Sequence, residues 1–386
     1  MRVDVNVSEA ILHWIIQTVR LDSISPEIAD NLIKWASGEK KPTFNQIEKA
    51  SKATRIPLGY FFLQTPPEEK IPLMEYRTVD STSVEKPSRN LIDTIHNMGM
   101  IQSWTREYLI SEGVQPPICV GAYSRYNDLH GCVKKTRQLL DLTENWFVKC
   151  KNAEDSFKYL RKKISNSGVI VMMNGIVENN TYRALDIEEF RAFAMIDEYA
   201  PLVFINTNDS TNGRLFSLIH EFAHVCIGKN DLFNDRQNSI HTVSPIETLC
   251  NAIAGEILVP KDIFLKQWEN AIKEKTAEEA TCDLAKTFRC GVIVIARKAL
   301  DNGKINKNMY NNIASQAIMT YIQNRKRQDA GGDFYKTLAS RIDQRFLGML
   351  NHSVSEGKTL YSDAFRLTNT NRMTYTRLTQ EKMGGV

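Results

Sequence analysis

The sequence predicts an α+β protein that is predominantly helical, with one small sheet in its middle third. Apolar residues recur at helical spacing over most of the 386 residues. Three short apolar segments bounded by turn residues interrupt this pattern, and each is typical of a buried strand: 169–173, 190–195 and 202–206. An apolar helical segment follows the third strand directly, which predicts a sheet covered by a helix.

Four regions are predicted from the order of these elements and from the punctuating Gly and Pro residues. They are a helical module over 1–70, a helical connecting region over 71–165, an α+β domain over 166–303 and a basic helical C-terminal region over 304–386.

Composition narrows the class of protein. A content of 42% hydrophobic and 24% charged residues is ordinary for a globular protein, and no run approaches 18 apolar residues. The N-terminus is polar where a signal peptide needs an apolar stretch. The seven cysteines are scattered and form no C-x-x-C pair, which favours reduced thiols; Cys226 and Cys250 are predicted to be small buried residues. We therefore expect a cytoplasmic protein with no membrane partner.

The N-terminal module is predicted from helix-capping signals between residues 8 and 63. Ser25 before Pro26 is a favourable N-cap with proline at the first helical position. Thr43 and Gln46 have the spacing of a capping box that opens another helix. These signals predict a small helical bundle.

The motif H-E-x-x-H occurs once, at His220, Glu221 and His224. Apolar runs on both sides, ended by Gly228, predict a buried helix. A spacing of four residues on a helix brings both imidazoles to one face, where they can share a metal ion, and Glu221 lies beside that ion. The alternative interpretation is a core helix with two hydrogen-bonded histidines.

A third ligand is needed to hold a catalytic zinc ion. Glu247 begins an apolar-faced helix over 247–260, and Asn251 follows one turn later, where it can hydrogen-bond a ligating imidazole. Glu256 is a rival ligand, although two and a half turns of helix separate it from Glu247. The other interpretation of Glu247 is an exposed glutamate favoured by the helix dipole.

Together, the H-E-x-x-H motif and the segment Glu247-x-x-Cys-Asn251-x-x-Ala-x-Glu-Ile-Leu-Val-Pro260 resemble the ImmA/IrrE family of zinc metallopeptidases. The resemblance implies a zincin-like peptidase domain, Zn²⁺ as the cofactor and Glu247 as its third ligand. Glu221 then acts as the general base toward a zinc-activated water. For the donor to the oxyanion, His241 is the candidate nearest in the chain, with Tyr182 and Tyr199 as alternatives; a lone loop histidine is also often simply solvated.

The N-terminal module from Trp35 to Leu63 is similar to the first domain of bacterial proteins that fuse an XRE-type helix-turn-helix to an ImmA/IrrE peptidase. The resemblance implies a regulator in a stress, mobile-element or toxin-antitoxin locus. This chain departs from the pattern because the segment from Ser25 to Trp35 leaves room for one helix. The module also has 9 Lys and Arg against 9 Asp and Glu over residues 1–70, so protein docking is an alternative to DNA binding.

The C-terminal region is the basic part of the chain, with 13 Lys and Arg against 6 Asp and Glu over residues 304–386. Segments 361–367 and 373–378 are predicted to form two short helices joined by a turn. The candidate nucleic-acid contacts around this turn are Arg366, Arg372 and Arg377. A solvated basic helical tail is the alternative.

The leading prediction from these patterns is a regulatory zinc endopeptidase that cleaves a protein partner of the repressor or antitoxin type. The alternative is a DNA-binding regulator or antitoxin that neutralises a cognate toxin by binding, with the peptidase fold as a sensor or scaffold. A third candidate is a zinc hydrolase of non-peptide amides.

Overall fold

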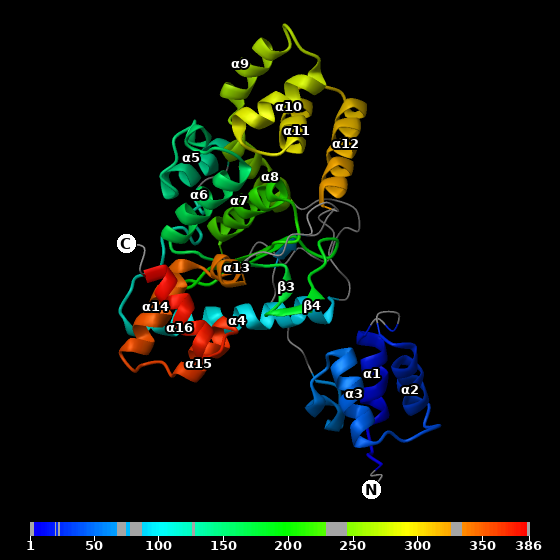
Figure 1. Cartoon of the computed structure of the whole chain (residues 1–386). Coiled ribbons are helices and arrows are strands. Elements are labelled where there is room, and N and C mark those ends of the chain that lie inside the picture. Colours follow the sequence, from blue (N-terminus) through cyan, green and yellow to red (C-terminus); the bar gives the residue numbers. More distant parts are fainter. Residues whose placement is uncertain are drawn as a thin grey trace. The chain divides into compact units, whose positions relative to one another are not determined.

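The computed structural model describes residues 4–19, 21, 24–67, 75–77, 87–125, 128–228, 245–325 and 334–383. The chain divides into two compact units, Met1–Leu73 with Val84–His96, and Met74–Ser83 with Asn97–Val386. Most elements are helices and a small sheet lies in the second unit, which confirms the predicted α+β, predominantly helical fold class. Figure 1 shows the elements with their labels. None of the described helices is both long and apolar enough to cross a membrane.

The first unit is a small helical bundle. Its elements are α1 (Glu9–Thr18), α2 (Pro26–Ala36), α3 (Phe44–Thr54) and the 3-10 helix η2 (Leu58–Phe62). The predicted capping box is present, because the Thr43 hydroxyl accepts from Gln46 N and the Gln46 side chain accepts from Thr43 N. The buried core joins all four elements and includes Ile11, Ile15, Leu32, Ile47 and Phe61.

Between α1 and α3, the described residues form one α-helix, α2. A full second helix, turn and recognition helix would be needed there for a complete XRE-type arrangement. Two cations of this unit are neutralised locally, since Lys34 pairs with Asp30 at 2.8 Å and Lys52 pairs with Glu48 at 2.6 Å. These pairs, together with the equal numbers of cationic and anionic residues over 1–70, leave the unit without a net positive charge.

The sheet of the second unit has the strand order β1-β5-β6-β2. Its strands are β1 (Glu75–Arg77), β2 (Ile170–Asn174), β5 (Ala192–Met195) and β6 (Leu202–Asn206). β5 is antiparallel to both β1 and β6, whereas β6 and β2 are parallel. The three predicted strands are confirmed. β1 was missed, because it lies in the region 71–165 that the sequence predicts as helical.

A separate two-stranded hairpin, β3 (Ile176–Val177) with β4 (Asn180–Ala184), follows β2. Its exposed polar residues give no apolar alternation, so the sequence carries little signal for it.

The remaining helices lie before and after the strands in the chain. Those before and after the strands are α4 (Arg89–Ser111), α5 (Leu129–Leu139), η3 (Trp146–Lys149), α6 (Ala153–Asn166), α7 (Thr211–Ile227) and α8 (Pro245–Leu258). The following helices are α9 (Lys261–Ala271), α10 (Ala277–Phe288), α11 (Val292–Asp301), α12 (Lys307–Arg325), α13 (Phe334–Arg341), α14 (Gln344–Ser355), α15 (Tyr361–Thr368) and α16 (Arg372–Met383).

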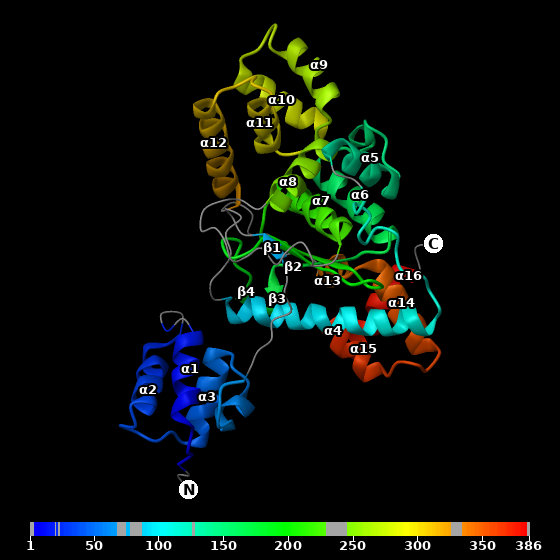
Figure 2. The same ribbon diagram turned by 180° about the vertical axis from the view of Figure 1, so that it is seen from behind.

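The two faces of the sheet carry different side chains. Ala192, Ala194 and Val203 belong to the core shared with α7 and α8, whereas Phe193 and Phe204 stack on each other at a ring distance of 5.1 Å. Neighbouring residues of a strand point to opposite faces, so small side chains lie under α7 and aromatic ones on the far face. In Figures 1 and 2, α6, α7 and α8 lie on one side of the strands and α4 on the other.

The C-terminal region packs against strand β2, which is an edge strand of the sheet. The carboxylate of Asp343 accepts from Val171 N in β2 and from Phe346 N in α14, both at 3.1 Å. Asp343 is 2% exposed, and Phe346, Leu350 and Leu378 are also buried. The helices of this region therefore build part of the second unit, and the interpretation of its exposed basic side chains as a solvated face stays an alternative.

Candidate metal centre

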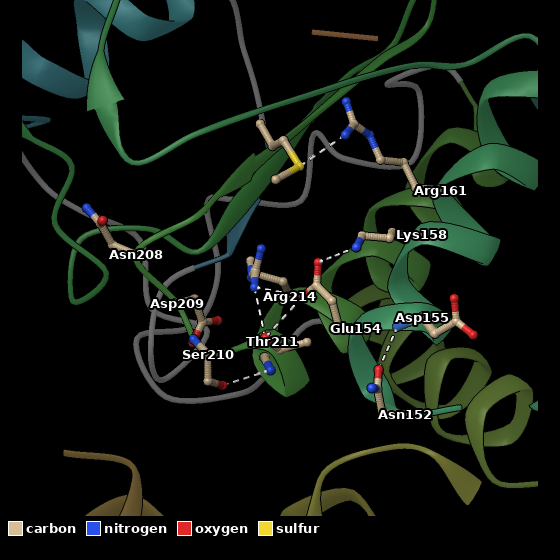
Figure 3. A network of polar contacts seen from close by, with 12 residues as sticks. Asn152, Glu154, Asp155, Lys158, Arg161, Asn208, Asp209, Ser210, Thr211 and Arg214 are labelled. Carbon is tan, nitrogen blue, oxygen red and sulfur yellow. Dashed lines mark hydrogen bonds and ion pairs between the residues drawn. The ribbon is translucent and has the colours of Figure 1, made fainter. Parts of the chain in front are cut away.

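Polar contacts at its first turn position helix α7 against the sheet and α6. Ser210 caps the helix by accepting from Gly213 N at 3.0 Å, and the carboxylate of the preceding Asp209 receives two 3.0 Å hydrogen bonds from Arg191. Arg214 reaches Glu154 of α6 at 3.4 Å (Figure 3). Asp209 is buried, so these charge-assisted hydrogen bonds compensate its desolvation and fix the start of the helix.

The other end of α7 is held by a loop from far earlier in the chain. Gly121 N donates to Val225 O at 3.2 Å and Tyr123 N donates to Cys226 O at 2.9 Å, which satisfies carbonyls that a helix end leaves open. Gly228 follows with φ +82°, and a Cβ on it would lie 2.6 Å from the Cα of Gly121. Only glycine fits this close approach, so the predicted stop signal is also a packing requirement.

Between these fixed ends, α7 presents the H-E-x-x-H motif in the interior. His220, Glu221 and His224 are each 1% exposed. The two imidazoles lie one turn apart, with their Nε2 atoms 3.0 Å from each other. The predicted arrangement of both histidines on one helix face is therefore present.

Helix α8 brings the Glu247 carboxylate to both histidines. Its Oε2 lies 3.2 Å from His220 Nε2 and its Oε1 lies 3.0 Å from His224 Nε2. All three donor groups lie within 4.8 Å of one another. A tetrahedral zinc ion with bonds of about 2.0–2.1 Å places its donor atoms about 3.3 Å apart, so two imidazole nitrogens and a carboxylate at these separations fit Zn²⁺.

The electrostatics of the cluster favour an ionised carboxylate. Burial raises the pKa of Glu247, but hydrogen bonds and attraction from His220 and His224 outweigh burial and hold this pKa well below its usual range. The Glu247 side chain is 21% exposed, against 1% and 2% for the two imidazoles. Solvent therefore reaches Glu247 more than it reaches either imidazole.

Cys226 and Cys250 are fully buried, as predicted. Burial raises the pKa of both thiols, so they are neutral at physiological pH. In addition, His224 interacts electrostatically with the Cys250 thiol and opposes part of this rise in its pKa, an interaction that sequence reasoning missed. The available signal was its position one turn after Glu247 on the apolar face of α8.

The positions of the other candidate side chains give less support for a role at the cluster. No hydrogen bond between described residues joins Asn251, which is half-buried on α8, to either imidazole, so its supporting role stays a prediction. His241, the first candidate for the oxyanion donor, lies outside the described residues. Tyr182 is 91% exposed on β4, and the Tyr199 ring lies 5.4 Å beneath the guanidinium of Arg106.

Glu256, the rival carboxylate of α8, has a different task. One of its oxygens pairs with Lys298 of α11, and the other accepts from Lys261 N at the start of α9 at 2.9 Å. Glu256 thus links α8, α9 and α11. It is not one of the three side chains that could hold a metal ion, which are His220, His224 and Glu247.

The three arginines predicted as nucleic-acid contacts lie on two helices. Arg366 is on α15, where it pairs with Asp363 at 3.4 Å and lines a polar hollow of about 480 Å³ beside the β3–β4 turn. Arg372 begins α16 and is exposed, and the guanidinium of Arg377 lies 3.7 Å from the ring centre of Tyr335. The structure therefore places Arg372 and Arg377 on one helix, α16, and Arg366 on another, α15.

Comparison with known families agrees with this placement of the site. Residues 342–381 match the model of a domain of unknown function, DUF8813. No curated protein and no solved structure matches the chain. Residues 171–300, which contain the H-E-x-x-H helix, Glu247 and three strands of the sheet, match the model of the IrrE N-terminal-like domain, Peptidase_M78; this part of the chain is therefore similar to the ImmA/IrrE family.

Proposed function

We propose that the protein is a zinc-dependent endopeptidase whose metal is held by His220, His224 and Glu247. The observation that carries this proposal is the convergence of their donor atoms, with separations of 3.0 to 3.2 Å, inside a domain that matches a peptidase family. When bound there, Zn²⁺ lowers the pKa of a water toward neutrality and polarises a carbonyl.

Glu221 supplies the proton transfer. It is adjacent to His220 in α7, and its carboxylate is enclosed in the protein interior. In this position it accepts a proton from the attacking water and returns it to the leaving amine, as a general base and then a general acid. The rigid ends of α7 keep this carboxylate in a fixed position relative to the two imidazoles, which avoids reorganisation during the reaction.

The substrate that we propose is a protein of the repressor or antitoxin type in a bacterial regulatory setting. Support comes from the similarity of residues 171–300 to the IrrE N-terminal-like domain and from the resemblance of the N-terminal module to regulators of this kind. Binding without cleavage, with the same fold as a sensor, is the competing function. The two differ in whether the Glu221 carboxylate is needed.

The test uses the full chain loaded with Zn²⁺ and a peptide library made from a bacterial proteome. New N-termini are identified by mass spectrometry for wild type, for Glu221→Gln and for Glu274→Gln, an exposed glutamate that serves as the matched control. We expect cleavage by wild type and by Glu274→Gln, and a loss of at least about 100-fold for Glu221→Gln with its zinc content unchanged. Equal cleavage by Glu221→Gln would disprove the proposed mechanism.

A further inference from the structure

Helices α14, α15 and α16 form a three-helix unit at the end of the chain, at the periphery of the second unit in Figures 1 and 2. α15 has 8 residues and α16 has 12, and the three residues 369–371 join them. Asn369 ends α15 in the left-handed conformation, with φ +51°. Two short helices joined by a turn of three residues, with a left-handed residue at its start, have the order of elements found in a helix-turn-helix.

The inner side of this unit is a well-packed core. Ala364 and Leu367 of α15 are buried, and so are Tyr375 and Leu378 of α16. The rings of Phe365 and Tyr375 meet edge to face at 5.7 Å. Because buried side chains from both helices interlock, the outer face of α16 is presented in a fixed orientation.

The outer side of α16 is a continuous polar stripe. Its exposed residues follow a spacing of four along the helix: Arg372, Met373, Thr376, Arg377 and Gln380. The helix has no Asp or Glu between Arg372 and Gln380. The stripe thus carries two cations, two neutral hydrogen-bonding groups and one apolar side chain, Met373, which is 73% exposed.

We propose that α14–α16 is a DNA-binding unit, with α16 as the helix that enters the major groove of double-stranded DNA. The side chains of the stripe have the chemistry of base recognition: arginine pairs with guanine, glutamine with adenine, and threonine with either. Met373 offers apolar contact to a thymine methyl group. The stacking of Arg377 on Tyr335 restricts its guanidinium before binding, which lowers the entropy cost of a specific contact.

Charge complementarity favours duplex DNA over a protein partner. Between residues 344 and 383, the three helices carry 6 Lys and Arg against 3 Asp and Glu, whereas residues 1–70 are balanced at 9 against 9. Phosphate attraction therefore acts at this end of the chain, and an α-helix fits the width of the major groove. The matched model over residues 342–381 coincides with these three helices, so they also form one unit in sequence.

The test is fluorescence anisotropy with the full chain and a random-sequence DNA duplex, followed by selection of the preferred sequence from that pool. We expect binding that weakens as salt rises. Arg372→Gln/Arg377→Gln should lower the affinity by about 10- to 100-fold and reduce the slope of log K against log salt by about 2. Thr376→Ala/Gln380→Ala should change the selected sequence and leave that slope unchanged, because these side chains contact bases and carry no charge.

The control is Lys40→Gln/Lys41→Gln, which removes two exposed cations from the first unit and changes the net charge by the same amount. This variant should bind DNA like wild type. Loss of binding here with retention in Arg372→Gln/Arg377→Gln would overturn the proposal, as would the absence of duplex binding by wild type at low salt. Urea unfolding midpoints of all variants show whether a loss of DNA binding comes from lost contacts with DNA or from an unfolded protein. The outcome is independent of peptidase activity.

Discussion

Nε2 of His224 on α7 lies 3.0 Å from Oε1 of Glu247 on α8, and with the contact from His220 this carboxylate joins the two helices at the proposed metal centre. Residues 229–244, which join these helices, lie outside the described part of the chain, and α7 and α8 pack against each other. A metal ion bound by both side chains would act as a cross-link between α7 and α8. The stability of the domain and its metal affinity are therefore coupled.

Glu247→Ala should abolish tight zinc binding, whereas Glu256→Ala should keep it. Both carboxylates are on α8, but only Glu247 lies with the two imidazoles, and Glu256 pairs with Lys298. We expect a loss of affinity of at least about 100-fold for Glu247→Ala, measured by competition with a chromophoric chelator. Similar zinc affinities for the two variants would contradict the assignment of the third ligand.

Removal of the metal should lower the free energy of unfolding of the second unit. A ligand present at 100 times its dissociation constant stabilises the folded state by about 2.7 kcal/mol. Urea unfolding of wild type with zinc and with excess chelator should show a difference of about this size. Glu247→Ala should have the same urea midpoint with zinc and with chelator. This control shows that the difference in wild type comes from bound metal and not from another effect of the chelator.

Gly228→Ala should destabilise the protein by several kcal/mol, because a Cβ there meets the backbone of Gly121 at 2.6 Å and because φ is +82°. Gly348 on α14 is the matched control, since a Cβ on it has no atom within 4 Å. Gly348→Ala should stabilise by about 0.5–1 kcal/mol through a better helix propensity. Thermal unfolding of the two variants measures both effects, and equal melting temperatures would contradict the packing of α7 on the Gly121 loop.

Asp343→Ala should cost about 2–4 kcal/mol of unfolding free energy. The change removes the cap of α14 and leaves the buried N–H of Val171 without its acceptor. It also removes a carboxylate that lies near the buried guanidinium of Arg161. Asp363→Ala, which breaks an exposed pair with Arg366, should cost less than about 1 kcal/mol, so denaturant titrations should rank the two variants clearly.

One of the seven cysteines should react rapidly with a thiol reagent in the native protein. Cys282 is exposed, and the other six are buried. Burial raises the pKa of the Cys119 thiol to about 11, so the unfolded state loses this proton at lower pH than the folded state does. The stabilisation that the neutral Cys119 thiol gives to the folded state is therefore fully present below about pH 9 and is lost as the pH rises toward 11. Fast labelling of two or more cysteines at pH 8 without urea would show that this core opens readily.

Local patterns predicted much of the catalytic region. The strands over 169–173, 190–195 and 202–206 are apolar runs bounded by turns. The H-E-x-x-H motif lies between apolar runs of one helix, and Gly228 ends that helix. The spacing within one helix determines that His220 and His224 share a face. The position of Glu247 beside them depended on a family resemblance, because packing between separate helices has no local signal.

Features that depend on long-range contacts were not predictable from the sequence. Strand β1 has three residues and pairs with β5, which lies more than 100 residues later. The interaction between Cys250 and His224 joins two helices, and the loop that caps α7 comes from residues 119–123. The burial of the C-terminal helices was missed as well, since its key residue, Asp343, looks like an ordinary surface cap in the sequence.

The position of Asp343 has a practical consequence for any shortened form of the protein. The segment that matches the peptidase family ends at residue 300, before α13 and α14. A fragment that ends at residue 300 would leave the outer edge of β2, including the N–H of Val171, open to another strand. Such a fragment is prone to self-association, so solubility screens of the isolated domain should extend through α16 before low yield is attributed to the catalytic core.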